Sequence, residues 1–161
     1  MGGPAISNGE NIPATDNFLV CKFVIDGLTW ISAEQYFQSC KFTSDNEAFS
    51  KIRNETDGMA LWAIGRAGTG VRPDWESVKV DTMYKAVFEK FQQNADLKAQ
   101  LLATGSSRFS FPPEENGFWA EWNAKILETV REQLKPPDRQ DTSLVDFMRQ
   151  SFAQYSAENR K

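Results

Sequence analysis

The sequence predicts a single domain that is mainly α-helical and contains a small β element, an α+β fold dominated by its helices. Apolar residues recur at helical spacing through several long stretches, whereas only one region alternates with a period of two. The chain has 161 residues, of which 40% are apolar and 25% are charged. This is the length of one domain and is enough to bury a core. The sequence contains no run of about 18 apolar residues, so it predicts no transmembrane helix.

The β element is expected near the N-terminus. Residues 19–25 and 28–31 alternate between two faces, and Asp26-Gly27 between them is a strong turn signal. We therefore expect two short strands joined as a hairpin. Residues 1–15 lack a basic segment followed by an apolar one, so we expect a flexible leader and no signal peptide.

Capping residues and apolar spacing predict the helices that follow. Ser32 and Gln35 have the spacing of a capping box that opens a helix, and the segment from Ser44 to Glu47 forms a second box. The expected helices cover residues 33–42, 44–53, 58–65, 75–92, 95–103, 118–134 and 143–157.

Two connecting stretches set the expected organisation of the chain. Residues 105–117 are irregular, with a short strand expected at 108–111, and the segment from Lys135 to Asp138 contains two prolines that make a stiff linker. The chain is thus divided into a leader (1–15), a domain (16–134) and a linker with a C-terminal amphipathic helix (135–161). The apolar stripe of that helix comprises Leu144, Phe147, Met148, Phe152 and Tyr155.

The composition excludes several classes of active site. Because the chain has no histidine, it cannot form a Ser-His-Asp triad, a Cys-His pair or a histidine zinc motif. Proton transfer must therefore use Asp, Glu, Lys, Tyr or Cys. The net charge of −4 argues against gripping long nucleic acid through its phosphates. Two isolated cysteines, Cys21 and Cys40, are typical of an intracellular protein, cytoplasmic or nuclear, although one disulfide is conceivable.

The first helix presents the most informative candidate site. Glu34, Gln38 and Lys41 follow one another at i, i+4 and i+7 and so share one helix face, with Phe37 between them. Glu34 lies in the first turn, where the helix dipole favours an ionised carboxylate. Such a group suits a base or a stabiliser of positive charge better than a proton donor. The alternative is an ordinary solvated polar face.

Two further segments are candidates for binding. The loop from Gly65 to Trp75 places Arg66 and Arg72 beside three glycines, which suits a phosphate, although it lacks P-loop spacing and is equally typical of a helix connection. The segment GFWAEW at 117–122 places aromatic residues beside acids, which suits stacking on a base or sugar. Tryptophans near a helix start are more often core anchors.

Taken in order, these segments resemble the NADAR family of NAD- and ADP-ribose-related domains. The resemblance begins at Asn17-Phe18 and continues through DGLTWISAEQYFQSCKF, which is similar to the family pattern DGxxWxTxEHYFQAxKF. It then includes RPDWESVKVDTM at 72–83 and KFQQNADLKAQLLATG at 90–105. The C-terminal helix after Pro137 lies outside it.

The resemblance implies an N-glycosidase without a metal or a cofactor. Family members hydrolyse bonds between a ribosyl phosphate or ADP-ribose and a base-like amine, and some remove ADP-ribose from guanine in nucleic acids or nucleotides. Carried over by motif, Glu34 matches the essential glutamate and Lys41 the helix lysine. The substrate-binding residues expected from the resemblance and from the aromatic pattern are Asn17, Tyr36, Arg66, Asn116 and Trp119.

Lys41 is expected to act in one of two ways. As an ammonium it would hold a phosphate or sugar oxygen. As a neutral amine it would attack the sugar C1 and form a Schiff base, which requires a lowered pKa from burial or a nearby cation.

The chain also departs from the family pattern. Gln35 replaces a frequent histidine, Asn116 stands where an aspartate is usual, and the glycine-rich loop after Trp119 is shortened to AEWN. We expect a substrate preference different from that of the riboflavin-pathway members, with ADP-ribosylated guanine as the main candidate. The alternatives are a ribosylaminopyrimidine phosphate of riboflavin biosynthesis, a non-catalytic ADP-ribose-binding module, or an interaction protein that docks through the 143–157 stripe. We expect a monomer that makes no contact with membranes.

Overall fold

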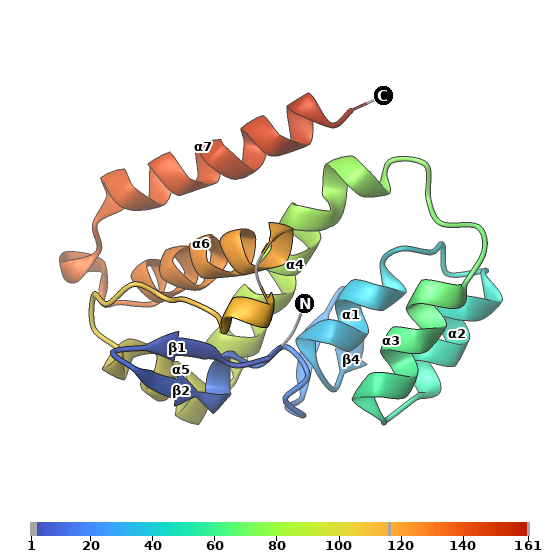
Figure 1. Ribbon diagram of the computed structural model, residues 1–161, viewed down its shortest axis with the longest axis horizontal. Helices are drawn as coiled ribbons and strands as arrows, with labels where there is room; N and C mark the ends of the chain where they lie inside the picture. The colour runs from blue at the N-terminus through green and yellow to red at the C-terminus, as the bar shows by residue number, and fades with distance from the viewer. Residues whose placement is uncertain (1–2, 116, 161) are drawn as a thin grey trace.

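The fold is built around helix α4, residues Trp75–Gln93, against which α1, α5, α6, α7 and β3 all pack. The computed structural model describes residues 3–115 and 117–160 (Figure 1). The described elements are β1 (Ala5–Ser7), β2 (Glu10–Ile12), η1 (Pro13–Thr15), β3 (Phe23–Ile25), β4 (Leu28–Trp30), α1 (Ala33–Ser39), α2 (Glu47–Asn54), α3 (Gly58–Ala67), α4, α5 (Ala95–Ala103), η2 (Pro113–Glu115), α6 (Phe118–Gln133), η3 (Pro137–Arg139) and α7 (Thr142–Glu158). The prediction of a mainly helical domain with a small β element is confirmed.

The apolar spacing of α4 explains its central position. Val80, Met83, Val87 and Phe91 recur on one face, are almost completely buried, and belong to the main hydrophobic core. Helix α6 lies on the same core, and α7 crosses above both helices in Figure 1. Helices α2 and α3 form a separate pair at the other end of the molecule, and α1 packs against both of them as well as against α4.

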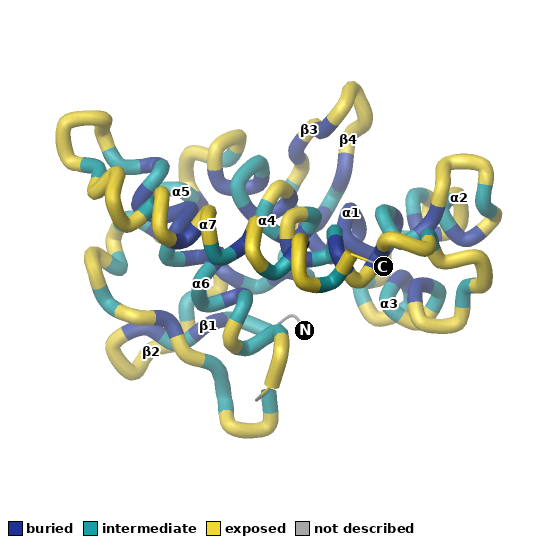
Figure 2. The backbone as a smooth tube through the Cα atoms, turned by 90° about the horizontal axis from the view of Figure 1, so that it is seen from above, coloured by how far each residue is buried: buried dark blue, intermediate teal, exposed yellow. Residues whose placement is uncertain are grey.

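The expected hairpin is present, with shorter strands than predicted. Strands β3 and β4 pair antiparallel, and their turn at Asp26 and Gly27 has φ values of 52° and 77°. Both values lie in the left-handed region that this turn type requires. The turn is exposed and projects from the body of the molecule in Figure 2.

The expectation of a flexible leader is wrong for residues 5–15. Strands β1 and β2 form a second antiparallel hairpin, whose turn at Asn8 and Gly9 has φ values of 52° and 78°. Ala5 is fully buried in the main core, and its backbone N–H donates to the Thr15 hydroxyl at 2.7 Å. The segment folds because Asn-Gly is the same turn signal as Asp-Gly, so the two hairpins have the same physical origin.

The irregular stretch after α5 is fixed by this second hairpin. Ile6 and Ser110 exchange two backbone hydrogen bonds of 2.7 and 3.0 Å, and Phe109 is buried beside them. The strand expected at 108–111 is therefore a single bridge.

Some helix ends differ from the prediction because of their caps. Helix α1 ends at Ser39, and α2 begins at Glu47 because Asn46, rather than Ser44, is its N-cap and accepts a hydrogen bond from the Ala48 N–H. Helix α7 buries Met148 and Phe152 but leaves 65% of Phe147 exposed, so only part of the expected stripe is covered. Cys21 and Cys40 are free thiols. Among the described residues, no helix is long and apolar enough to cross a membrane.

Candidate active site

Helix α1 is held firmly at its start, where the candidate glutamate lies. The Ser32 hydroxyl accepts a hydrogen bond from the Gln35 N–H at 3.0 Å, which confirms one half of the predicted capping box. The backbone N–H of Glu34 donates to the Asn17 carbonyl at 2.9 Å. The segment that precedes β3 therefore fixes the backbone of Glu34.

Glu34 and Gln38 form a buried pair rather than a solvated face. Both side chains have no exposed surface, and the Gln38 Nε2 donates to the Glu34 Oε1 at 2.7 Å. Within the described residues, neither the Glu34 Oε2 nor the Gln38 Oε1 has a hydrogen-bond partner. Because buried polar atoms are normally paired, two such atoms side by side indicate a site for a ligand.

The burial of this pair depends on Gly65 of α3. A Cβ atom built on Gly65 would lie 2.0 Å from the Gln38 Oε1, so glycine allows the two helices to approach closely without displacing the Gln38 side chain. The glycine of the Gly-Arg dipeptide thus shapes the floor of the site, while Arg66 follows it.

Burial raises the pKa of Glu34 to about 7, and the hydrogen bond from Gln38 and the positive charge of Lys41 only partly oppose this rise. The expectation that the helix dipole keeps Glu34 ionised is therefore wrong near neutral pH, because the loss of solvent outweighs a dipole effect of about 0.3–1 kcal/mol. A carboxyl group with this pKa can both accept and donate a proton near pH 7.

Lys41 follows α1 and is half-buried. Burial lowers the pKa of Lys41, Glu34 opposes this, and the cations Arg66 and Lys79 lower it further. The two conditions that a Schiff-base lysine requires, burial and a neighbouring cation, are both met here. Lys79 lies on α4 beside Glu76, and the sequence analysis missed both residues because nothing local links them to α1.

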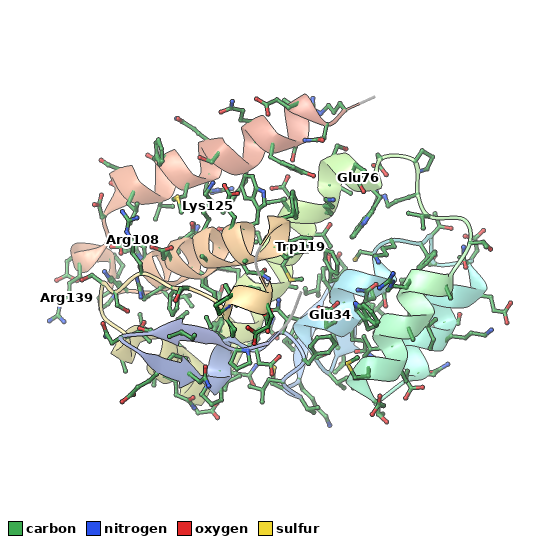
Figure 3. All side chains as sticks on the ribbon, in the orientation of Figure 1. Glu34, Glu76, Arg108, Trp119, Lys125 and Arg139 are labelled. Carbon is green, nitrogen blue, oxygen red and sulfur yellow. The ribbon has the colours of Figure 1, made fainter. Side chains whose placement is uncertain are left out.

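Aromatic rings form one wall of the site. Phe37 lies between Trp75 and Trp119, with ring centroids 5.0 and 5.1 Å away, and Trp119 stands almost perpendicular to it. The Lys41 Nζ lies 6.0 Å from the centre of the Phe37 ring. Figure 3 shows Glu34 and Trp119 in the same central part of the molecule, on α1 and at the start of α6. Trp119 is half-buried.

The two arginines of the 65–75 segment differ in their surroundings. Arg66 is exposed, lies 4.8 Å from the centre of the Trp62 ring, and is close enough to act on the pKa of Lys41. Arg72 instead binds Asp74 through two hydrogen bonds of 2.5 and 2.8 Å, and its backbone N–H donates to the Lys41 carbonyl. Arg66 is thus placed for an anionic ligand, whereas Arg72 secures the backbone of Lys41.

The other predicted binding residues are placed differently. Asn17 is buried, and its backbone carbonyl accepts the hydrogen bond from the Glu34 N–H; its expected role in substrate binding stays a prediction. Tyr36 lies on the opposite face of α1, where it packs edge-on against Trp30 at 5.2 Å, so the structure does not bring it together with Trp119. Asn116 lies outside the described residues.

Gln35, which replaces a frequent histidine of the family, has a structural role. Its Nε2 donates to the carbonyls of Ile52 and Arg53 at 3.2 Å, and its Oε1 accepts from the Ile31 N–H at 2.9 Å. The side chain therefore joins α1 to the end of α2 and points away from Glu34.

A second buried charge, Lys90, was also missed by the sequence analysis. Its side chain is fully buried on α4, and its Nζ donates to the Asp16 carbonyl at 2.8 Å. Burial lowers the pKa of Lys90 to about 8. Since Asp16 precedes Asn17, this bond anchors the segment that holds Glu34. Among the described residues, no cluster of three carboxylates or thiols is arranged to bind a metal.

The fold and this site define a class of protein. The chain belongs to the NADAR family, because the family model described as "NADAR domain" matches residues 6–135. It is 37% identical to the N-glycosidase YbiA of Escherichia coli (strain K12) over 80% of this chain and 85% of that protein. It is 31% identical to the riboflavin biosynthesis protein VVA0006 of Vibrio vulnificus, over 86% of this chain but 40% of that protein.

The fold supports the same assignment. The NMR structure of E. coli YbiA superimposes with a TM-score of 0.69 at 32% identity and covers 80% of this chain and 82% of that chain. The chain is therefore a NADAR protein whose relatives include N-glycosidases.

Proposed function

We propose that this protein is an N-glycosidase that hydrolyses the bond between C1 of a phosphorylated ribosyl group and the nitrogen of a base. The observation that carries the proposal is the fully buried Glu34, with one oxygen bound by Gln38 and the other without a partner among the described residues. A carboxyl group with a pKa raised to about 7 is suited to proton transfer at neutral pH.

Glu34 performs two tasks in the proposed reaction. As the C1–N bond breaks, its electrons move to the base nitrogen and positive charge builds at C1. The Glu34 carboxylate stabilises that charge and accepts a proton from a water molecule, whose oxygen bonds to C1. The base nitrogen takes up a proton as it leaves, so the products are the free sugar phosphate and the free base.

Lys41 supports the reaction in one of two ways that experiment can separate. An ammonium group would hold a phosphate or sugar oxygen. A neutral amine would bond to C1 as the sugar ring opens and the C1–N bond to the base breaks, so that the base leaves with a proton and a Schiff base remains, which water then hydrolyses to the free sugar and the free amine. The lowered pKa of Lys41 favours the second role. Borohydride traps only the Schiff base, as a protein adduct detectable by mass spectrometry.

The site suits ADP-ribose attached to guanine as the substrate. Arg66 and Lys79 both act electrostatically on Lys41, and the three cations offer positive charge to a diphosphate. The accessible part of Trp119 offers a flat surface on which a purine can stack. The proposed active unit is the monomer.

A ribosylaminopyrimidine phosphate is the second candidate substrate. The similarity to a relative named as a riboflavin biosynthesis protein favours it. The single phosphate of that compound would use fewer of the three cations.

A turnover assay tests the proposal and separates the two substrates. The wild type, Glu34→Gln and Lys41→Ala are incubated with ADP-ribosylated guanosine and with the pyrimidine compound, and chromatography follows base and sugar release. Lys51→Ala is the control, since Lys51 is an exposed lysine of α2 whose ammonium pairs with Glu47. We expect release of ADP-ribose, lost by about 10²-fold or more in Glu34→Gln and Lys41→Ala and unchanged in Lys51→Ala.

The other outcomes contradict part or all of the proposal. Release from the pyrimidine alone would assign the riboflavin-type substrate. No release from either compound, together with binding of ADP-ribose in calorimetry, would make the protein a non-catalytic reader.

A further inference from the structure

The C-terminal helix α7 packs against the start of α6, next to the aromatic wall of the site, although it lies outside the residues that match the family model. Tyr155 of α7 packs on Phe118 at 5.5 Å and on Trp122 at 5.2 Å between ring centroids. Phe118 and Trp122 belong to the first turns of α6, in the segment where the chain departs from the family pattern. This chain therefore places a further helix against its own variable segment.

Phe118 is held from a second side by α4. The Lys79 Nζ lies 4.4 Å from the centre of the Phe118 ring, and Glu76 binds the same ammonium at 2.7 Å. Burial raises the pKa of Tyr155, and the nearby Lys79 opposes this rise, which places Lys79 close to both rings. Phe118 is thus clamped between Tyr155 and Lys79.

The clamp is connected to the catalytic face through ring contacts. Phe118 meets Trp119 at 5.0 Å and 86°, and Trp119 meets Phe37 at 5.1 Å and 87°. Phe37 lies between Glu34 and Lys41 in the sequence of α1. A movement of Phe118 would therefore change the position of Trp119 relative to the two proposed catalytic residues.

The start of α6 has little local restraint of its own. It begins after Gly117, whose φ is 117°, and Gly117 provides no side-chain cap. A glycine in this conformation leaves the first turn free to adopt other angles. The position of Trp119 consequently depends on tertiary contacts: its own contact with Phe37, and those of Tyr155 and Lys79 with its neighbour Phe118.

We propose that α7 is an accessory brace of the active site, in which Tyr155 is a positioning residue that fixes Phe118 and thereby the stacking surface of Trp119. The brace makes α7 a determinant of substrate affinity in this protein. The affinity part rests on the proposed function, whereas the positioning part does not.

The position of Trp119 can be measured directly. The full-length protein is labelled with 5-fluorotryptophan, and its fluorine NMR signals are recorded, with the Trp119 signal assigned from Trp119→Phe. We expect Tyr155→Ala to shift or broaden the Trp119 signal. Tyr155→Phe, which keeps the ring, should restore it. The matched control is Phe147→Ala, which removes an aromatic ring from the exposed side of the same helix and should leave the signal unchanged.

Kinetics with ADP-ribosylated guanosine test the consequence for affinity. We expect Tyr155→Ala to raise KM about tenfold with kcat within about threefold of the wild type, because a stacking surface contributes mainly to binding. If Tyr155→Ala does not fold, as judged by circular dichroism, Tyr155→Leu removes the same ring contacts with a smaller loss of apolar volume.

Each outcome bears on the proposal. An unchanged Trp119 signal in a folded Tyr155→Ala or Tyr155→Leu variant would overturn the brace. A shifted signal with an unchanged KM would overturn its role in affinity. If the wild type lacks turnover, the proposed function fails, while the Trp119 signal still decides whether α7 positions that ring.

Discussion

The two faces of α1 are both buried, yet their polar side chains differ in how completely they are hydrogen-bonded. Gln35, on the face toward α2, uses its side-chain oxygen and nitrogen in hydrogen bonds with backbone groups. Gln38, on the face toward α3, makes one hydrogen bond, to Glu34, and its Oε1 has no partner among the described residues. The Glu34 Oε2 beside it is in the same condition.

We infer from this difference that one face of α1 stabilises the fold and the other face carries the proposed site. A buried amide whose groups are all bonded stabilises the fold, and changing it should cost stability. A buried carboxyl group with an unpaired oxygen and a raised pKa lowers the stability of the folded protein, so its presence favours a role in catalysis. Changes on the two faces should therefore have opposite effects on stability and activity.

The largest expected effect is a pH-dependent gain in stability for Glu34→Gln. Burial raises the pKa of Glu34 from 4.5 to about 7 in the folded protein. The protonated form is thus favoured by folding, and stability is lost as the pH rises from 4.5 through 7. Glutamine cannot ionise, so the difference in free energy of unfolding between variant and wild type should grow by about 3 kcal/mol from pH 4 to pH 8.

Urea unfolding at the two pH values measures this difference. Comparing the difference in free energy of unfolding at the two pH values cancels any effect of the new glutamine side chain that does not depend on pH. Glu47→Gln is the matched control, because Glu47 is fully exposed on α2 and should show no comparable growth. Equal growth in both variants would contradict a buried Glu34 with a raised pKa.

The next effect is a loss of stability in Gln35→Ala with activity retained. Removing this side chain takes away the partner of the Ile31 N–H and the side-chain donor to the carbonyls of Ile52 and Arg53, of which Ile52 still accepts from the Glu55 N–H; the loss should cost about 2–3 kcal/mol. For a chain of this length, Tm should fall by about 4–10 °C. At 25 °C, where the variant remains folded, kcat/KM should stay within about twofold of the wild type. A large loss of turnover in the folded variant would show that the two faces are not separate.

The sequence was sufficient for much of α1, because its signals are local. Ser32 and Gln35 marked the start of the helix, and the i, i+4, i+7 spacing placed Glu34, Gln38 and Lys41 on one face. The Asp26-Gly27 turn was equally local. Asn8-Gly9 carries the same turn signal, so the N-terminal hairpin could have been predicted from the sequence, although it was not.

The pKa shifts in the site could not be predicted from the sequence, because they arise from residues far away in the chain. The pKa of Glu34 depends on burial under α3, which the helix dipole argument ignored. Lys79 approaches Lys41 only because α4 packs on α1. No local pattern contains that information.

The smallest expected effect comes from Gly65→Ala, which tests how α3 holds the buried pair. In an exposed helix interior, replacing glycine by alanine gains about 1 kcal/mol. Here the new Cβ atom would lie 2.0 Å from the Gln38 Oε1, so the flexible end of Gln38 must move. The gain and the clash should leave stability within about 1 kcal/mol of the wild type.

The effect on turnover should be larger than the effect on stability. Moving Gln38 breaks its 2.7 Å hydrogen bond to Glu34, and we expect kcat/KM to fall about tenfold. Ala63→Gly on the exposed side of α3 is the control, because it should cost about 1 kcal/mol of stability and leave turnover unchanged. If Gly65→Ala retains full turnover, the hydrogen bond from Gln38 does not orient Glu34. The unused Glu34 oxygen alone would then distinguish this face of α1 from the other.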